Sequence, residues 1–194
     1  MLRIQKANDE RCQRVNLPQF RYHPDPLAAG MIQPSEAECV CCGEARGYVY
    51  TGPVFAVEDY EDCNCPWCIA DGSASKRLDA TFADDDGVGG GGQWDEVSED
   101  VVDEITKRTP GFTGWQQEQW WTHCDAAEFH GWAGHEQAIS LGEDFLDAIR
   151  ANTGIESDET WNEFLEALST EHGPTAYAFR CRNCGKLGGY TDTD

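Results

Sequence analysis

Two pairs of cysteines with the spacing Cys-x2-Cys lie in the first half of the chain, Cys39 with Cys42 and Cys65 with Cys68. Structural zinc takes four ligands at tetrahedral corners, and thiolate sulfurs bind it at about 2.3 Å. One such turn supplies two thiolates, so two turns brought together by a hairpin supply all four. The 22 residues between the pairs, 43–64, fit this arrangement. The pattern therefore predicts a structural Zn2+ site.

A third pair, Cys181 and Cys184, has no second Cys-x2-Cys partner. Its nearest ligand candidates lie in the run THCDAAEFHG, where Cys124 is the best third ligand. The fourth ligand is left open between His130, Glu128, His123, Asp125 and a water, in that order of preference. Four protein ligands would make a closed structural site. Three ligands and a water would make an open one, with Glu128 as the natural general base.

The remaining candidates are weaker. Cys41 and Cys63 could replace a ligand after a shift of register, but are better interpreted as ordinary thiols. The run Asp84–Asp86 could bind cations, although a solvated acidic linker explains it better. No glycine-rich phosphate loop precedes a basic residue, and no serine nucleophile elbow is present. The sequence therefore predicts no catalytic or organic cofactor-binding residues.

The charge balance is strongly acidic, with 36 Asp and Glu against 14 Lys and Arg and a net charge of −22. Such a surface repels nucleic-acid phosphates and anionic membranes. The longest basic cluster, Arg180–Arg182, is too short to reverse this. Many acids with few lysines are also typical of salt-adapted proteins, so a halophilic source and a simply acidic, soluble surface both remain open.

The first residues carry charges but no apolar segment of the kind that a signal peptide needs. No apolar run reaches the length of a transmembrane helix. We therefore expect a cytoplasmic protein. In that compartment disulfides are uncommon, and Cys-x2-Cys pairs more often bind metal or perform redox chemistry.

These motifs must be positioned by a small α+β fold in four parts. We expect a flexible leader at 1–16, a zinc-binding part at 17–83, an acidic glycine-rich linker at 84–93, and a C-terminal α+β part at 94–194. The order knuckle, hairpin, knuckle, helix predicts a treble-clef or ribbon finger, with strand-like runs at 47–52 and 53–57. Helical periodicity appears at 94–108, 135–150 and 158–171. A small mixed sheet and a strand-knuckle-strand unit at 175–190 complete the second part.

Several long motifs carry a family resemblance: LPQFRYHPDP, CVCCGEARGYVYTGPVF, CPWCIADGSASKRLDATF, RTPGFTGWQQEQWWTHC and TAYAFRCRNCG. Together, from Leu17 to Tyr190, they resemble the CbrC family of uncharacterised bacterial proteins, also called colicin tolerance protein. The resemblance implies a four-cysteine second site in many members. This chain departs from that pattern, because Glu128 stands near the place of the fourth cysteine.

These observations predict a zinc-binding, non-enzymatic module that contacts another, unknown protein and is linked to toxin tolerance or stress. The predicted metal ligands are Cys39, Cys42, Cys65, Cys68, Cys124, His130, Cys181 and Cys184. Two alternatives stay open: a metal-dependent enzyme with an open second zinc site, and a nucleic-acid-binding zinc protein with a basic patch around Arg180, Arg182 and Lys186.

Overall fold

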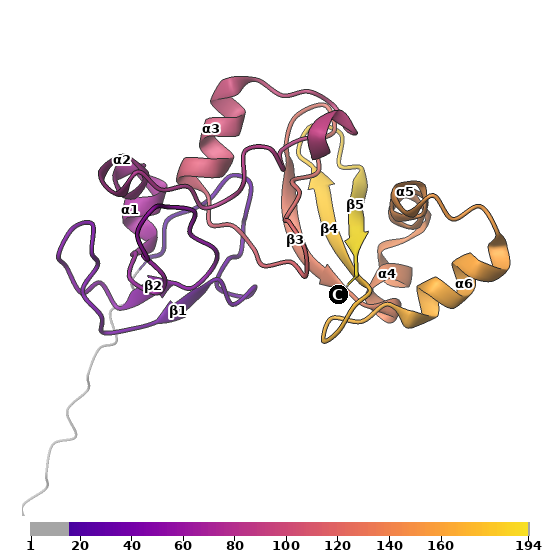
Figure 1. Cartoon of the computed structure of the whole chain (residues 1–194), viewed down its shortest axis with the longest axis horizontal. Coiled ribbons are helices and arrows are strands. Elements are labelled where there is room, and N and C mark those ends of the chain that lie inside the picture. Colours follow the sequence, from indigo (N-terminus) through magenta and orange to yellow (C-terminus); the bar gives the residue numbers. More distant parts are fainter. Residues whose placement is uncertain (1–15, 194) are drawn as a thin grey trace, which may run out of the picture.

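The computed structural model describes residues 16–193 and shows a mixed α/β protein (Figure 1). The described residues form two small sheets, six α-helices and one 3-10 turn. The predicted leader at 1–16 lies outside these residues, apart from Asn16. Within the described part of the chain, no helix is long and apolar enough to cross a bilayer.

The N-terminal part consists of a two-stranded antiparallel sheet and two short helices. Strands β1 (Ile32–Pro34) and β2 (Tyr48–Tyr50) pair, and helices α1 (Pro66–Ala70) and α2 (Ser73–Leu78) follow. The strand-like run at 53–57 forms no named strand. Only Phe55 pairs there, in an isolated bridge with Thr81. Pro53 lacks an N–H group, and Val57 is almost fully exposed, so neither supports a longer ladder.

The acidic glycine-rich segment at 84–93 forms turns and the 3-10 helix η1 (Gly90–Gly92). It contacts the C-terminal part, because Val88 bridges to Trp120 and the Gly89 N–H donates to the Trp120 carbonyl at 3.0 Å. Helix α3 (Glu99–Arg108) then begins five residues after Trp94, where the predicted helical periodicity starts. Acidic residues lie in its first turn and basic residues in its last, and these charges stabilise the helix through their interaction with its dipole.

The C-terminal sheet has three strands in the order β3 (Ala127–Ala133), β4 (Thr175–Cys181) and β5 (Leu187–Asp192). It is wholly antiparallel, not mixed. Three helices follow β3: α4 (His135–Leu141), α5 (Glu143–Thr153) and α6 (Asp158–Ala167). The helix expected at 135–150 is divided at Gly142, whose φ of 91° a right-handed helix does not allow.

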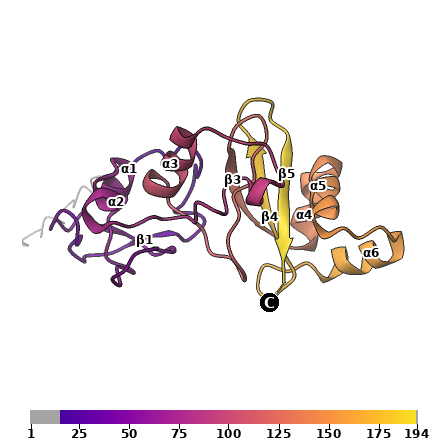
Figure 2. The same cartoon turned by 45° about the horizontal axis from the view of Figure 1, so that its top comes forward.

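Figure 2 shows the three-stranded sheet with the N-terminal part on one side and α4–α6 on the other. Two buried clusters correspond to these two faces. The larger joins Tyr50 and Phe82 of the N-terminal part to Phe129 and Phe179 of the sheet. The smaller packs α5 and α6 on the opposite face. Six of the seven β4 residues are buried, because both faces of this central strand are covered.

Candidate metal centres

The first candidate centre brings Cys39, Cys42, Cys65 and Cys68 together, with all four sulfurs within 4.8 Å of one another. The sulfurs of Cys42 and Cys65 lie 3.9 Å apart. Four thiolates at the usual zinc–sulfur distance lie roughly 3.8 Å apart at the corners of a tetrahedron. The spacing therefore fits a four-coordinate ion.

Local backbone structure holds each cysteine pair. The Gly43 N–H donates to the Cys39 carbonyl at 2.7 Å, and Gly43 takes a φ of 74°, which closes the first turn. Cys65 is the N-cap of α1, followed by Pro66. The Cys65 N–H donates to the Cys39 sulfur at 3.2 Å, which ties the two turns together and favours a thiolate at Cys39.

The two spare cysteines of this part lie outside the four-sulfur group. The Cys41 thiol lies 3.6 Å from the Ser73 hydroxyl, and the Cys63 thiol donates to the Tyr60 carbonyl at 3.0 Å. Burial raises the pKa of Cys63. Both sulfurs therefore have other partners and take no part in the cluster.

The second candidate centre brings His123, Cys124, Cys181 and Cys184 together within the same 4.8 Å limit. The His123 Nδ1 atom lies 3.1 Å from the Cys124 sulfur and 3.6 Å from the Cys184 sulfur. Two ligands of these types on one tetrahedral zinc lie roughly 3.6 Å apart. Unlike the first group, this one has two exposed members, Cys124 and Cys184.

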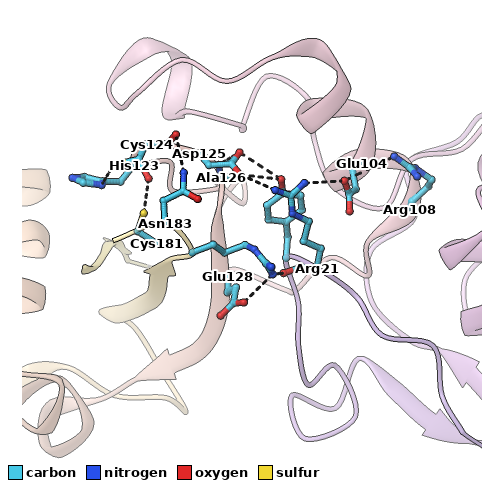
Figure 3. Close-up of polar contacts among 12 residues, drawn as sticks. Arg21, Glu104, Arg108, His123, Cys124, Asp125, Ala126, Glu128, Cys181 and Asn183 are labelled. Atoms are coloured by element: carbon cyan, nitrogen blue, oxygen red, sulfur yellow. Dashed lines mark hydrogen bonds and ion pairs between the residues drawn. The ribbon is translucent and has the colours of Figure 1, made fainter. Parts of the chain in front are cut away.

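Two tight turns position the second set. Cys181 is the last residue of β4. Gly185 has a φ of 77°, and its N–H donates to the Cys181 carbonyl at 2.9 Å. On the facing turn, Cys124 takes a φ of 62°, and its N–H donates to Asp95 Oδ2 at 2.8 Å. The Cys181 thiol donates to the His123 carbonyl at 2.8 Å, which joins the two turns (Figure 3).

The thiol pKa values differ within each cluster. At Cys39, burial opposes ionisation, but backbone N–H groups lower its pKa overall. Burial raises the pKa of Cys65 to about 11 and that of Cys68 further. In the second cluster, desolvation and neighbouring Cys184 raise the pKa of Cys124 to about 11. Thiolates so close together repel one another, so a cation bound among them would favour the ionisation of all the thiols.

His130 does not join the second cluster, although its residue type and spacing made it the preferred fourth ligand. It lies on β3, three residues beyond Ala127, the partner of Cys181 across the sheet. Three strand residues span about 10 Å, so His130 is carried away from the knuckle. Its Nε2 instead lies 3.6 Å from Glu128 Oε2. His123 is instead the fourth member of the cluster, and its place directly before Cys124 is the sequence signal for it.

The two carboxylates considered as ligands belong to an ion-pair network beside the cluster (Figure 3). Glu128 accepts from the Arg182 guanidinium at 2.9 Å, and Asp125 pairs with Arg21 at 3.0 Å. Arg182 also donates to the Arg21 carbonyl at 2.6 Å. Arg182 lies between the two knuckle cysteines, so the network links the second centre to the N-terminal segment.

Asp84–Asp86 form the third group of metal-competent side chains found in residues 16–193. All three are at least partly exposed. The Asp86 N–H donates to Asp84 Oδ1 at 3.1 Å, as expected for a turn. Exposed acids of this kind are satisfied by water, so the group adds no argument for a third metal centre.

The fold and the two clusters define a small mixed α/β protein with two cysteine-rich candidate metal centres. The chain belongs to the uncharacterised protein family UPF0167, whose family model matches residues 17–193. It is 48% identical over 182 residues to UPF0167 protein Mb2317 of Mycobacterium bovis, covering 91% of this chain and 93% of the relative. UPF0167 protein PA1536 of Pseudomonas aeruginosa is 44% identical over 172 residues, covering 88% and 93%. No solved structure matches the chain.

These matches correct one prediction. The predicted resemblance to the CbrC family is wrong, because the family model and the relatives identify the chain as UPF0167. Motif likeness alone did not identify the family. The inferred link to colicin tolerance is therefore withdrawn.

Proposed function

We propose that this protein is a non-enzymatic, zinc-binding interaction module of the cytoplasm, in which two closed zinc sites hold loops in position for contact with another protein. One observation carries the proposal: each of the two clusters gathers four ligand groups within 4.8 Å. A site closed by four protein ligands leaves no position for substrate or activated water, which is typical of structural zinc.

The donor sets favour zinc among the biological metals. The first site would offer four thiolates, and the second three thiolates and one imidazole. Soft sulfur ligands in tetrahedral sets suit zinc or an iron–sulfur cluster and disfavour magnesium and calcium. The cytoplasm keeps such thiols reduced and available for metal. We further propose that the first site is a treble-clef type of finger, supported by Cys65 at the N-cap of α1.

The first centre also presents apolar side chains. Val40 lies between Cys39 and Cys42 and is 48% exposed, and Val57, in the segment that joins the two cysteine pairs, is 99% exposed. Exposed apolar side chains on metal-fixed loops lose little conformational entropy when a partner binds them. We propose that this loop region contacts a protein partner.

The direct test is elemental analysis of the full chain purified without chelator. We expect two zinc ions per chain in the wild type and one in each of the variants Cys65→Ser and Cys181→Ser. Cys63→Ser is the matched control and should retain both ions, because its sulfur bonds to the Tyr60 carbonyl. Iron in place of zinc, or a Cys65→Ser variant that keeps both ions, would overturn the proposed sites.

The interaction role needs its own measurement. Proteins captured from cell extract by the wild type are compared quantitatively with those captured by the double variant Val40→Ser, Val57→Ser at equal zinc content. A partner that the wild type captures and the double variant does not supports the proposal. An identical set of captured proteins from both forms would contradict it.

A further inference from the structure

A cleft of about 440 Å³ opens beside the C-terminal sheet, away from the ligands of both metal centres. It lies between the loop at 113–115, β3, β4 and the turn before β4. Its lining residues are Thr113, Gly114, Trp115, Trp132, Thr170 and Tyr177. Its volume lies within the range of small-molecule sites.

Three aromatic side chains dominate the lining. Trp115 is 46% exposed, which is high for so large an apolar residue. Its indole N–H donates to the Thr175 hydroxyl at 2.8 Å, and the Trp132 indole N–H donates to the Thr113 carbonyl at 3.0 Å. Both indoles are therefore held in place with their only donor already used. What they can offer a ligand is the surface of their π systems.

A buried carboxylate lies directly behind this lining. The Tyr177 hydroxyl donates to Asp192 Oδ2 at 2.9 Å, and the backbone N–H of Trp115 donates to the same atom at 3.1 Å. Asp192 is 7% exposed, and its other oxygen, Oδ1, has no hydrogen-bond partner among residues 16–193. A Cβ atom on Gly114 would lie 3.3 Å from both Asp192 Oδ2 and the Tyr177 hydroxyl. The wall of the cleft thus lies against the carboxylate.

The cleft also lacks positive charge. No Lys or Arg contributes to its lining, and no ion pair involves Asp192 within residues 16–193. A second carboxylate, Glu118, accepts from the Gly114 N–H at 3.1 Å. The whole chain carries a net charge of −22. The electrostatic potential at this cleft therefore favours a cation.

We propose that the cleft between Trp115, Trp132 and Tyr177 binds an organic cation of the trimethylammonium type. A quaternary ammonium group needs no hydrogen-bond acceptor, and it binds to tryptophan and tyrosine rings through their negative π faces. The carboxylate behind Tyr177 adds long-range attraction. This site is independent of the proposed zinc function, because none of its lining residues is a metal ligand.

The test separates charge from shape in the zinc-loaded full chain. Calorimetric titration with choline is compared with titration of 3,3-dimethyl-1-butanol, which has the same shape without the charge. We expect choline to bind at least about tenfold more tightly, as a partly desolvated cation–π site predicts. Equal affinities, or no binding of choline at millimolar concentration, would overturn the proposal whatever the zinc content.

Two further arms locate the site and its natural source. Trp115→Leu should weaken choline binding about tenfold, whereas Phe55→Leu, a partly exposed aromatic outside the cleft, should leave it unchanged. Unchanged binding in Trp115→Leu would contradict the assignment. A peptide carrying trimethyllysine is compared with its unmethylated form and with choline. Preference for the methylated peptide over choline assigns the cleft to a protein side chain, and the reverse assigns it to a free metabolite.

Discussion

The guanidinium of Arg21 lies 3.0 Å from the carboxylate of Asp125, the residue that follows the cluster cysteine Cys124 (Figure 3). The same guanidinium lies 3.6 Å from Glu104 on α3. One side chain near the start of the described chain thus contacts both α3 and the turn that carries two members of the second cluster, His123 and Cys124. The shared aromatic core packs the N-terminal part against the sheet, and the Arg21 contacts link the same two parts.

The Arg21–Asp125 pair is expected to contribute little to stability by itself. The Arg21 side chain is 43% exposed, so solvent and salt screen its charge. A double-mutant cycle with Arg21→Ala and Asp125→Asn should give a coupling energy of roughly 1 kcal/mol or less, and less again at high salt. Chemical denaturation of the zinc-loaded protein measures it. A coupling well above that, insensitive to salt, would contradict this assessment.

The choice between the two histidines gives a sharp test of the second centre. His123→Ala should lower the metal content by one ion per chain, because His123 Nδ1 lies beside Cys124 and Cys184. His130→Ala is the matched control and should keep both ions, since its imidazole lies beside Glu128. Elemental analysis of the two variants decides, and the reverse pattern would make His130 the ligand.

His23 should make stability depend on pH between about 4 and 6.5. Its Nδ1 lies 2.8 Å from the Pro110 carbonyl, and burial lowers its pKa from 6.5 to about 4. Between these pH values the His23 imidazole is protonated in the unfolded chain but neutral in the folded chain. The contribution of neutral, buried His23 to the free energy of unfolding is therefore fully present above pH 6.5 and is lost as the pH falls towards 4. It amounts to roughly 3 kcal/mol, at 1.36 kcal/mol for each pKa unit.

Denaturation of wild type and His23→Gln at several pH values, with zinc content checked at each, tests this. The variant should be less stable at pH 7, and its stability should fall less steeply on acidification. Metal loss in acid affects both proteins, so only the difference between their slopes reports on His23. Parallel slopes would show that His23 does not titrate in this way.

Gly111 should tolerate no side chain. A Cβ atom there would lie 1.9 Å from the backbone carbonyl of Phe82, and the Gly111 N–H donates to the buried Tyr50 hydroxyl at 3.0 Å. Gly111→Ala should therefore lower the free energy of unfolding by about 1–3 kcal/mol or more. Gly134→Ala, whose nearest contact is 3.2 Å, is the milder control. Equal thermal stability of the two variants would contradict the close packing at Gly111.

Much of the architecture was predictable from local signals. Helix α3 has acids in its first turn and bases in its last, and the strand-knuckle-strand unit around Cys181 has its own turn glycine, Gly185. Signals of this kind act within a few residues. The division of one expected helix at Gly142 was less predictable, because isolated glycines often lie inside helices. The run at 53–57 failed as a strand because β-structure needs a partner, which local sequence does not supply.

The sequence by itself determined the first candidate centre. Two Cys-x2-Cys turns at a short separation bring Cys39, Cys42, Cys65 and Cys68 together through local chain geometry, so spacing alone identifies the set. The second centre was decided by the tertiary structure. Cys124 and Cys181 meet only because β3 pairs with β4 in one register, and that register carries His130 away and leaves His123 beside the sulfurs. Strand register depends on long-range packing of the buried faces, which a single sequence does not reveal.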